Sequence, residues 1–171
     1  MSRLRATIGL AVVLAACAPG ATSAPPEPTA EGDIPAHSSI SPHDDHPALA
    51  RLDPALLAAV RQATEDARRS GIELRVTSGW RSADYQRRLL DAAIAKHGSL
   101  EEARRWVATP EGSAHVTGEA VDIGPTDAAD WLIRNGDRYG LCQTYANEMW
   151  HFELRTTPGG QCPAPLPDAG G

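Results

Sequence analysis

The sequence lacks an apolar run long enough to cross a membrane. Its most apolar stretch, residues 8–16, is about half of the roughly 20 residues that a spanning helix needs. The stretch follows Arg3 and Arg5 and ends in small residues, which is the pattern of a secretory signal peptide. We therefore expect residues 1–16 to direct export of the chain.

Cysteine is scarce, with three residues in the chain. The sequence LAAC at residues 14–17 resembles a bacterial lipobox, so we expect lipid on Cys17 to anchor the exported chain to a membrane of the bacterial envelope. A plain signal peptide with an incidental cysteine is the alternative. Cys142 and Cys162 then remain as a pair in an oxidising compartment, and we predict a disulfide between them. Two reduced thiols, or thiolate ligands of a metal, are the other interpretations.

Basic residues are too few for a nucleic-acid binder. The chain has 16 Lys and Arg against 22 Asp and Glu, a formal charge of −6. Loss of Arg3 and Arg5 with the signal peptide would leave 14 basic against 22 acidic residues, a charge of −8. Such a surface does not match a phosphate backbone, so we expect no nucleic-acid partner. The simplest interpretation of the acidity is solubility.

Large apolar side chains are also rare in residues 18–47, which are rich in Pro, Ala, Ser and Thr. A segment of this composition can bury too little apolar surface to offset the conformational entropy that it would lose on folding. We therefore expect residues 17–47 to form a flexible tether. The sequence HDDH at residues 43–46 resembles a metal cluster by composition, but a solvated linker is the preferred interpretation. Residues 48–162 can form one core without internal repeats. We expect them to be one monomeric domain, followed by a disordered tail over residues 163–171.

Helical and strand periodicities alternate within this domain. Asp53 and Pro54 suit the N-cap and first position of a helix that Gly71 ends. Further helices are expected over residues 83–96, 99–107 and 126–135, strands over residues 72–77, 119–123 and 150–154, and a loop over residues 108–118. This order favours an α+β fold with a small, mainly antiparallel sheet and helices packed on it.

Two imidazoles and a carboxylate form a split set of metal-ligand residues: His115, Asp122 and His151. Three protein ligands leave one position open at a catalytic zinc. Asp122 and His151 fall on predicted strands and His115 in the loop before one of them, so the sheet can bring all three together. We predict one zinc ion per chain at the sheet, although other first-row metals suit the same ligands. For His151 alone, a core histidine is the alternative.

Glu148 would make such a site catalytic. A carboxylate three residues before a ligand can reach water at the metal without binding the metal, and can act as general base and then general acid. Glu153 lies two residues after His151, on the same face of a strand, where it can accept a hydrogen bond from that imidazole or face solvent. Tyr145 is a candidate cleft residue, with ordinary packing as its alternative.

Three motifs occur in a fixed order along the domain. They are Ser-Gly-Trp-Arg-Ser at residues 78–82 with Gln86, Ser-x-His-x-x-Gly-x-Ala-x-Asp at residues 113–122, and Asn-Glu-Met-Trp-His at residues 147–151. Together they resemble the vancomycin-resistance-type D-alanyl-D-alanine carboxypeptidases of the lysostaphin and D-Ala-D-Ala metallopeptidase group. The resemblance spans roughly residues 52–154. It implies the zinc-ligand and catalytic roles already considered for His115, Asp122, His151 and Glu148.

The resemblance also implies substrate contacts. Arg81 would either grip a terminal carboxylate or stabilise the charge that develops on the polarised carbonyl. Ser113 and Gln86 match positions near the substrate. Trp80 stands where many relatives have tyrosine, which keeps an aromatic wall but loses a hydroxyl group.

The export signal and the resemblance together imply a lipid-anchored zinc D,D-carboxypeptidase that removes the terminal D-alanine from peptidoglycan stem peptides. A D-Ala-D-Ala dipeptidase or a peptidoglycan endopeptidase would use the same residues with a different cleft. A non-catalytic, zinc-containing wall-binding module is the alternative from another class. Glu148 and Arg81 argue against that module, because a binder has no need of a base.

Overall fold

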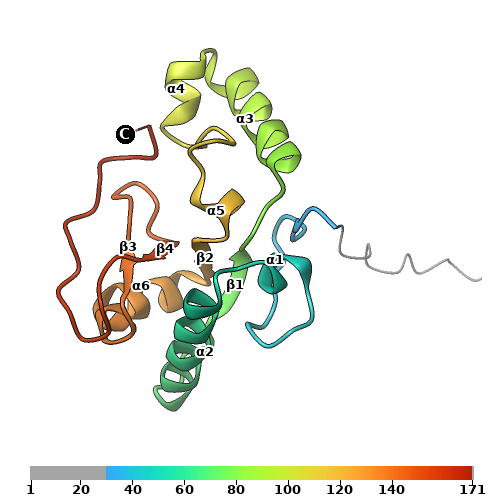
Figure 1. The fold of residues 1–171 in the computed structure, drawn as a ribbon. Helices are drawn as coiled ribbons and strands as arrows, with labels where there is room; N and C mark the ends of the chain where they lie inside the picture. The colour runs from blue at the N-terminus through green and yellow to red at the C-terminus, as the bar shows by residue number, and fades with distance from the viewer. Residues whose placement is uncertain (1–29, 171) are drawn as a thin grey trace, which may run out of the picture.

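The computed structural model describes residues 30–170. The predicted signal peptide and Cys17 lie outside the described residues. A four-stranded antiparallel sheet runs through the centre of the fold (Figure 1). In their order across the sheet, the strands are β1 (Arg75–Ser78), β2 (Ala120–Gly124), β4 (His151–Leu154) and β3 (Leu141–Gln143). The helices are α1 (Pro47–Ala50), α2 (Pro54–Arg69), α3 (Ala83–His97), α4 (Leu100–Arg104), α5 (Ala114–Thr117), α6 (Thr126–Asn135) and the 3₁₀ turn η1 (Gly136–Tyr139).

Helices cover the sheet unevenly. Figure 1 shows α2 and α6 on one side of the strands and α3 and α4 on the other. Helix α6 packs on β2 and β3, and α2 packs on β3 and α6. The main core between these elements includes fully buried Phe152, Leu56 and Val121, whereas α3 and α4 share a small separate cluster around Leu90. The fold is therefore α+β, as predicted.

Local sequence signals set the ends of the long helices. The Asp53 carboxylate accepts hydrogen bonds from the backbone N–H groups of Ala55 and Leu56, so it caps α2 as expected. Gly98 ends α3 in the left-handed conformation, with φ of 87°. Several features differ from expectation: β1 begins at residue 75 rather than 72, α4 stops at residue 104, residues 114–117 form α5 instead of loop, and α1, η1 and β3 were not predicted.

The register across the central strands positions the site. Asp122 of β2 lies directly opposite His151 of β4 and, beyond an irregularity in β1, opposite Ser78. Paired residues on neighbouring strands project their side chains to the same face. Residues far apart in the sequence therefore meet at one point on the sheet.

The segment over residues 30–47 packs on the domain, which differs from the flexible tether expected there. Ile40 and Val76 exchange backbone hydrogen bonds of 2.9 Å. Glu31 pairs with Arg88, and the His46 ring accepts a hydrogen bond from the N–H of Ala48 to cap α1. The amino-acid composition of the segment did not indicate that it is ordered, because backbone pairing and helix capping, more than large apolar side chains, attach it to the domain. No helix in the described part of the chain is long and apolar enough to span a membrane.

The tail is also attached to the domain. Cys142 and Cys162 are bonded, as predicted. The N–H of Leu166 donates to the Thr144 carbonyl at 2.9 Å, and the Leu166 carbonyl accepts from the N–H of Ala146 at 2.8 Å. The disordered tail predicted from residue 163 onward is therefore wrong for the residues around Leu166, because they pair with the backbone beside the sheet.

Candidate metal centre and active site

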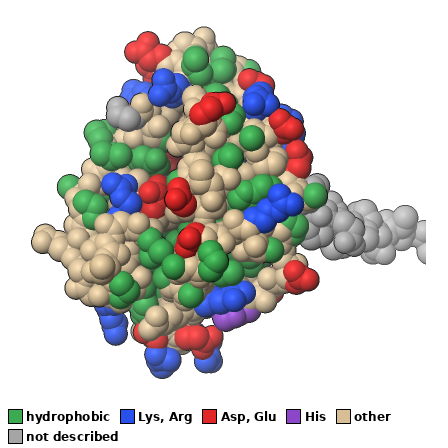
Figure 2. All heavy atoms as spheres, viewed as in Figure 1, with side chains coloured by type: hydrophobic (Ala, Val, Ile, Leu, Met, Phe, Trp, Pro, Cys, Tyr) green, Lys and Arg blue, Asp and Glu red, His purple; other side chains and the backbone are tan. Residues whose placement is uncertain are grey.

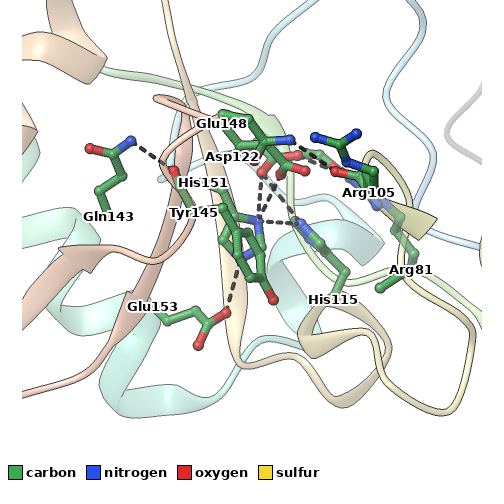
Figure 3. A network of polar contacts seen from close by, with 12 residues as sticks. Arg81, Arg105, His115, Asp122, Gln143, Tyr145, Glu148, His151 and Glu153 are labelled. Carbon is green, nitrogen blue, oxygen red and sulfur yellow. Dashed lines mark hydrogen bonds and ion pairs between the residues drawn. The ribbon is translucent and has the colours of Figure 1, made fainter. Parts of the chain in front are cut away.

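Three potential ligand atoms converge on the face of the sheet (Figure 3). Nε2 of His115 lies 3.2 Å from Nδ1 of His151, and each of these nitrogens lies 3.3 Å from Oδ1 of Asp122. All three side chains are buried. The sequence-predicted ligand set is thus assembled within one small volume.

A short helix places His115. Helix α5 presents this histidine toward β2 and ends at Gly118, whose φ is 80°. A Cβ atom on Gly118 would lie 2.4 Å from the backbone oxygen of Arg51. Only glycine suits both the left-handed backbone and this close approach. The glycine therefore lets the ligand-bearing turn pack tightly against the chain before α2.

Each imidazole is oriented by its outer nitrogen. Nδ1 of His115 lies 2.8 Å from the carbonyl oxygen of Gly79, to which it can donate. Nε2 of His151 lies 3.0 Å from Oε1 of Glu153. Such partners fix the tautomer of a metal-binding histidine and direct the other nitrogen inward. Glu153 therefore faces His151 rather than solvent.

The donor set fits a cation. Oδ1 of Asp122 is buried and accepts no hydrogen bond from residues 30–170. Burial opposes its ionisation, but His115, His151 and Arg81 together hold the pKa of Asp122 well below its usual range. Burial lowers the pKa of His115, which favours the neutral ring that a metal requires. Burial also disfavours a charged His151, yet the adjacent carboxylates of Asp122 and Glu153 raise its pKa to about 9, so a metal ion competes with a proton there.

Glu148 lies at the edge of this cluster. Its Oε2 is 3.8 Å from Nδ1 of His151, and its side chain is buried. Burial raises the pKa of Glu148 to about 7, with a smaller contribution in the same direction from Asp122. A carboxyl group with this pKa can exchange a proton near neutral pH.

Arg81 is fixed by three partners. Its guanidinium donates to Oδ2 of Asp122 at 2.9 Å, to the hydroxyl of Ser78 at 2.8 Å and to Oε1 of Gln86 at 3.1 Å. Gln86 in turn donates to the Ala108 carbonyl at 2.9 Å. Arg81 thus orients the carboxylate of Asp122, and buried Gln86 helps to hold Arg81 in place.

A cavity of about 180 Å³ opens beside these groups. Ser113 and Gln86, which the resemblance puts near the substrate, and Tyr145, the candidate cleft residue, all line this cavity. Ser113 makes no capping hydrogen bond to α5, so its hydroxyl remains available at the cavity wall.

Trp80 is placed elsewhere. Its indole N–H donates to the Val116 carbonyl at 3.1 Å, and its ring stacks under the Arg51 guanidinium at 4.3 Å. Trp80 is not one of the described residues that line the cavity. In this structure the ring turns toward α1 and α5 and packs there, so it does not form the aromatic wall expected from the sequence.

Two other tryptophans contribute to the cavity wall. Trp106 and Trp150 both line it, with 48% and 42% of their surface exposed. Sequence reasoning gave neither a role at the site. For Trp150 the available signal was its position next to His151. For Trp106 the signal was weak, because it lies in a loop after α4. Charges of both signs are interspersed on the face in Figure 2, so that face carries no broad field of one sign.

Comparison with known proteins identifies relatives of the domain. The family model VanY, described as D-alanyl-D-alanine carboxypeptidase, matches residues 49–156. A D-alanyl-D-alanine carboxypeptidase of Enterococcus faecalis is 28% identical over 127 residues, which cover 60% of this chain and 47% of that protein. The bifunctional D-Ala-D-Ala dipeptidase and D-Ala-D-Ala carboxypeptidase VanXYC of Enterococcus gallinarum is 26% identical over 161 residues, covering 78% of this chain and 82% of that protein. This chain spans about half the length of the first of these relatives.

Solved structures resemble the same region. VanYB in complex with D-alanine-D-alanine aligns with a TM-score of 0.59 and 25% identity, over 71% of this chain and 80% of that one. An E-to-A mutant of the vancomycin resistance D,D-pentapeptidase VanY in complex with Zn(II) aligns with a TM-score of 0.58 and 25% identity, over 71% and 82%.

Proposed function

Because the chain belongs to the VanY family of D-alanyl-D-alanine carboxypeptidases, we propose that it is a zinc-dependent enzyme that removes the terminal D-alanine from peptidoglycan stem peptides. The observation that carries this proposal is the position of Glu148, buried beside three converging ligand atoms at the wall of a small cavity. One zinc ion held by His115, Asp122 and His151 would supply the Lewis acid that polarises the scissile carbonyl and activates water.

The remaining chemistry belongs to side chains of this chain. Glu148 takes the proton of the attacking water and passes it to the leaving amine. Its pKa of about 7 suits both steps. The Arg81 guanidinium, fixed by Ser78, Asp122 and Gln86, offers positive charge at the cavity wall to a carboxylate or to the developing oxyanion. Ser113 and Tyr145 provide hydroxyl groups for the peptide.

The proposed location is the outer side of a bacterial membrane. It is supported by the signal-peptide pattern over residues 1–16 and by the lipobox that ends at Cys17. Lipid on Cys17 would hold a monomeric domain near the wall peptide on which it acts.

The test is release of D-alanine from a stem pentapeptide that ends in D-Ala-D-Ala. We expect release by the zinc-loaded protein, loss of release with chelator, and recovery when zinc is restored. For a Glu148→Gln variant in the same assay, Glu73→Gln is the matched control, because Glu73 is an exposed carboxylate on the segment before β1. Release that survives complete removal of metal would contradict the proposal.

A dipeptidase is the second candidate, because the relative from Enterococcus gallinarum carries both activities in its name. Comparing free D-Ala-D-Ala with the pentapeptide separates the two. A carboxypeptidase cleaves the pentapeptide with the higher kcat/KM, and a dipeptidase cleaves the free dipeptide better. The wall-binding alternative has no use for Glu148, and it predicts that the protein turns over neither substrate.

A further inference from the structure

Residues 163–170, here called the strap, return from the far end of the sheet to the cavity. The Cys142–Cys162 disulfide holds the chain just before the strap. Leu166 pairs with the backbone of residues 144–146, and Asp168 forms an ion pair of 3.0 Å with Arg105, beyond α4. Figure 1 shows this part of the chain climbing from β3 toward α4. The strap therefore bridges the two sides of the fold between which the cavity lies.

The sequence of the strap restricts its flexibility. Pro163, Pro165 and Pro167 alternate with other residues, and each proline fixes its own φ. Leu166, between two of them, uses both its N–H and its carbonyl in backbone hydrogen bonds. Proline is tolerated at the edge of a sheet where its missing donor is not needed. The pattern is thus that of an ordered edge segment, which loses little entropy when it is held in place.

The strap forms part of the cavity wall. Ala169 lines the cavity of about 180 Å³ together with Trp106, Tyr145 and Glu148. A neighbouring cavity of about 760 Å³ shares Arg81, Asp122 and Trp150 with the first, and it extends away toward His37 and Tyr85. Glu148, His115 and His151 line the small cavity alone, whereas Arg81 and Asp122 lie between the two cavities. Taken together as one substrate groove, the cavities have a small end that is bounded by the strap and an end that is about four times larger.

We propose that the strap closes one end of the substrate groove and limits the peptide to a single small residue beyond the scissile bond. This inference rests on the proposed function. In it, the terminal residue of the substrate occupies the small cavity beside Ala169, and the rest of the stem peptide leaves through the larger cavity. Peptides that continue beyond that terminal residue, such as cross-linked stems, meet the strap and are poor substrates.

The test compares two peptides on the full, zinc-loaded chain. One ends in D-Ala-D-Ala, and the other continues from the same D-alanine through two added glycines. The double variant Leu166→Pro and Asp168→Asn removes one backbone hydrogen bond and the ion pair with Arg105. We compare kcat/KM for the extended peptide with kcat/KM for the peptide that ends in D-Ala-D-Ala, and we expect the double variant to raise this ratio about tenfold. Each lost contact should contribute a few-fold to that increase.

Two further variants keep the result interpretable. Asp130→Asn breaks a surface ion pair with Arg134 on α6, away from the cavity, and should leave the ratio unchanged. Ala169→Trp fills the cavity from the strap side and should raise KM for the terminal peptide by about tenfold or more, even if the double variant fails to fold.

An unchanged ratio in a folded double variant would overturn the proposal, as would wild-type protein that cleaves both peptides equally. Failure of the proposed function has a different signature, namely no hydrolysis of either peptide by wild type. In that case calorimetric binding of the two peptides decides, since a closed groove still binds the terminal peptide more tightly. Equal affinities for the two peptides would then contradict the proposal that the strap closes the groove.

Discussion

Removing the carboxylate that orients His151 should weaken metal binding without unfolding the protein. Glu153 lies 3.0 Å from Nε2 of His151, and its side chain is 15% exposed. Loss of such a partner typically costs 10- to 100-fold in metal affinity, which corresponds to about 1.4 to 2.8 kcal/mol. We expect Glu153→Ala to reach the upper part of this range, because it removes both the acceptor and its charge.

The size of the effect should depend on what replaces the carboxylate. In Glu153→Gln an oxygen acceptor remains and the negative charge is lost. This variant should therefore keep the orientation of His151 and lose about tenfold in affinity. Glu119→Ala is the control, since Glu119 is an exposed carboxylate just before β2. Competition with a chromophoric chelator measures zinc affinity directly and needs no substrate.

Equal zinc affinities for wild type, Glu153→Ala and Glu153→Gln would refute this reasoning. They would mean that packing alone fixes the ring of His151. A loss of affinity in Glu119→Ala of the same size would also refute it, because the effect would then come from general negative charge rather than from the contact with Nε2.

Other perturbations have equally definite outcomes. Gly118→Ala should lower the free energy of unfolding in urea by more than Gly71→Ala does. Both glycines have positive φ, and the left-handed backbone alone costs about 1–2 kcal/mol, but of the two only Gly118 would bring the added Cβ to 2.4 Å from a backbone oxygen. Equal losses of stability in the two variants would contradict the steric argument. Tyr139 donates a hydrogen bond to Asp66 and lowers the pKa of that carboxyl group. The stability from this contact is present above the unfolded-state pKa and is lost as pH falls through the folded-state pKa. Tyr139→Phe should therefore flatten the acid side of the thermal-stability profile, and an unchanged profile would count against the contact.

The metal site could be predicted largely from the sequence, because the types and order of its residues are chemically specific. His115, Asp122 and His151 are close neighbours in space, and the strands at residues 120–124 and 151–154 lie within a few residues of their predicted bounds. The buried carboxylate of Glu148 also lies beside this set. For Asp122 and His151, strand spacing was informative because strand geometry leaves little freedom in where a side chain points. His115 lies on α5, a helix that the sequence did not predict.

Features that depend on contacts distant in sequence could not be predicted in this way. The role of Gln86 as a support for Arg81 requires knowing that its amide also reaches Ala108, 22 residues away. Trp80 turns from the cavity because its indole N–H finds the Val116 carbonyl. The order of residues 30–47 and of the strap arises from backbone pairing, on which composition carries little information.

The most direct measurement is D-alanine release by wild type and Glu148→Gln proteins that carry the same amount of zinc. The substitution keeps the size of the side chain and removes its ability to accept the proton of water. We predict that zinc content is unchanged and that kcat falls by about 10² to 10⁴, the usual contribution of a positioned general base. A Glu148→Gln protein with equal zinc and an undiminished rate would contradict the assignment of Glu148 as the catalytic base.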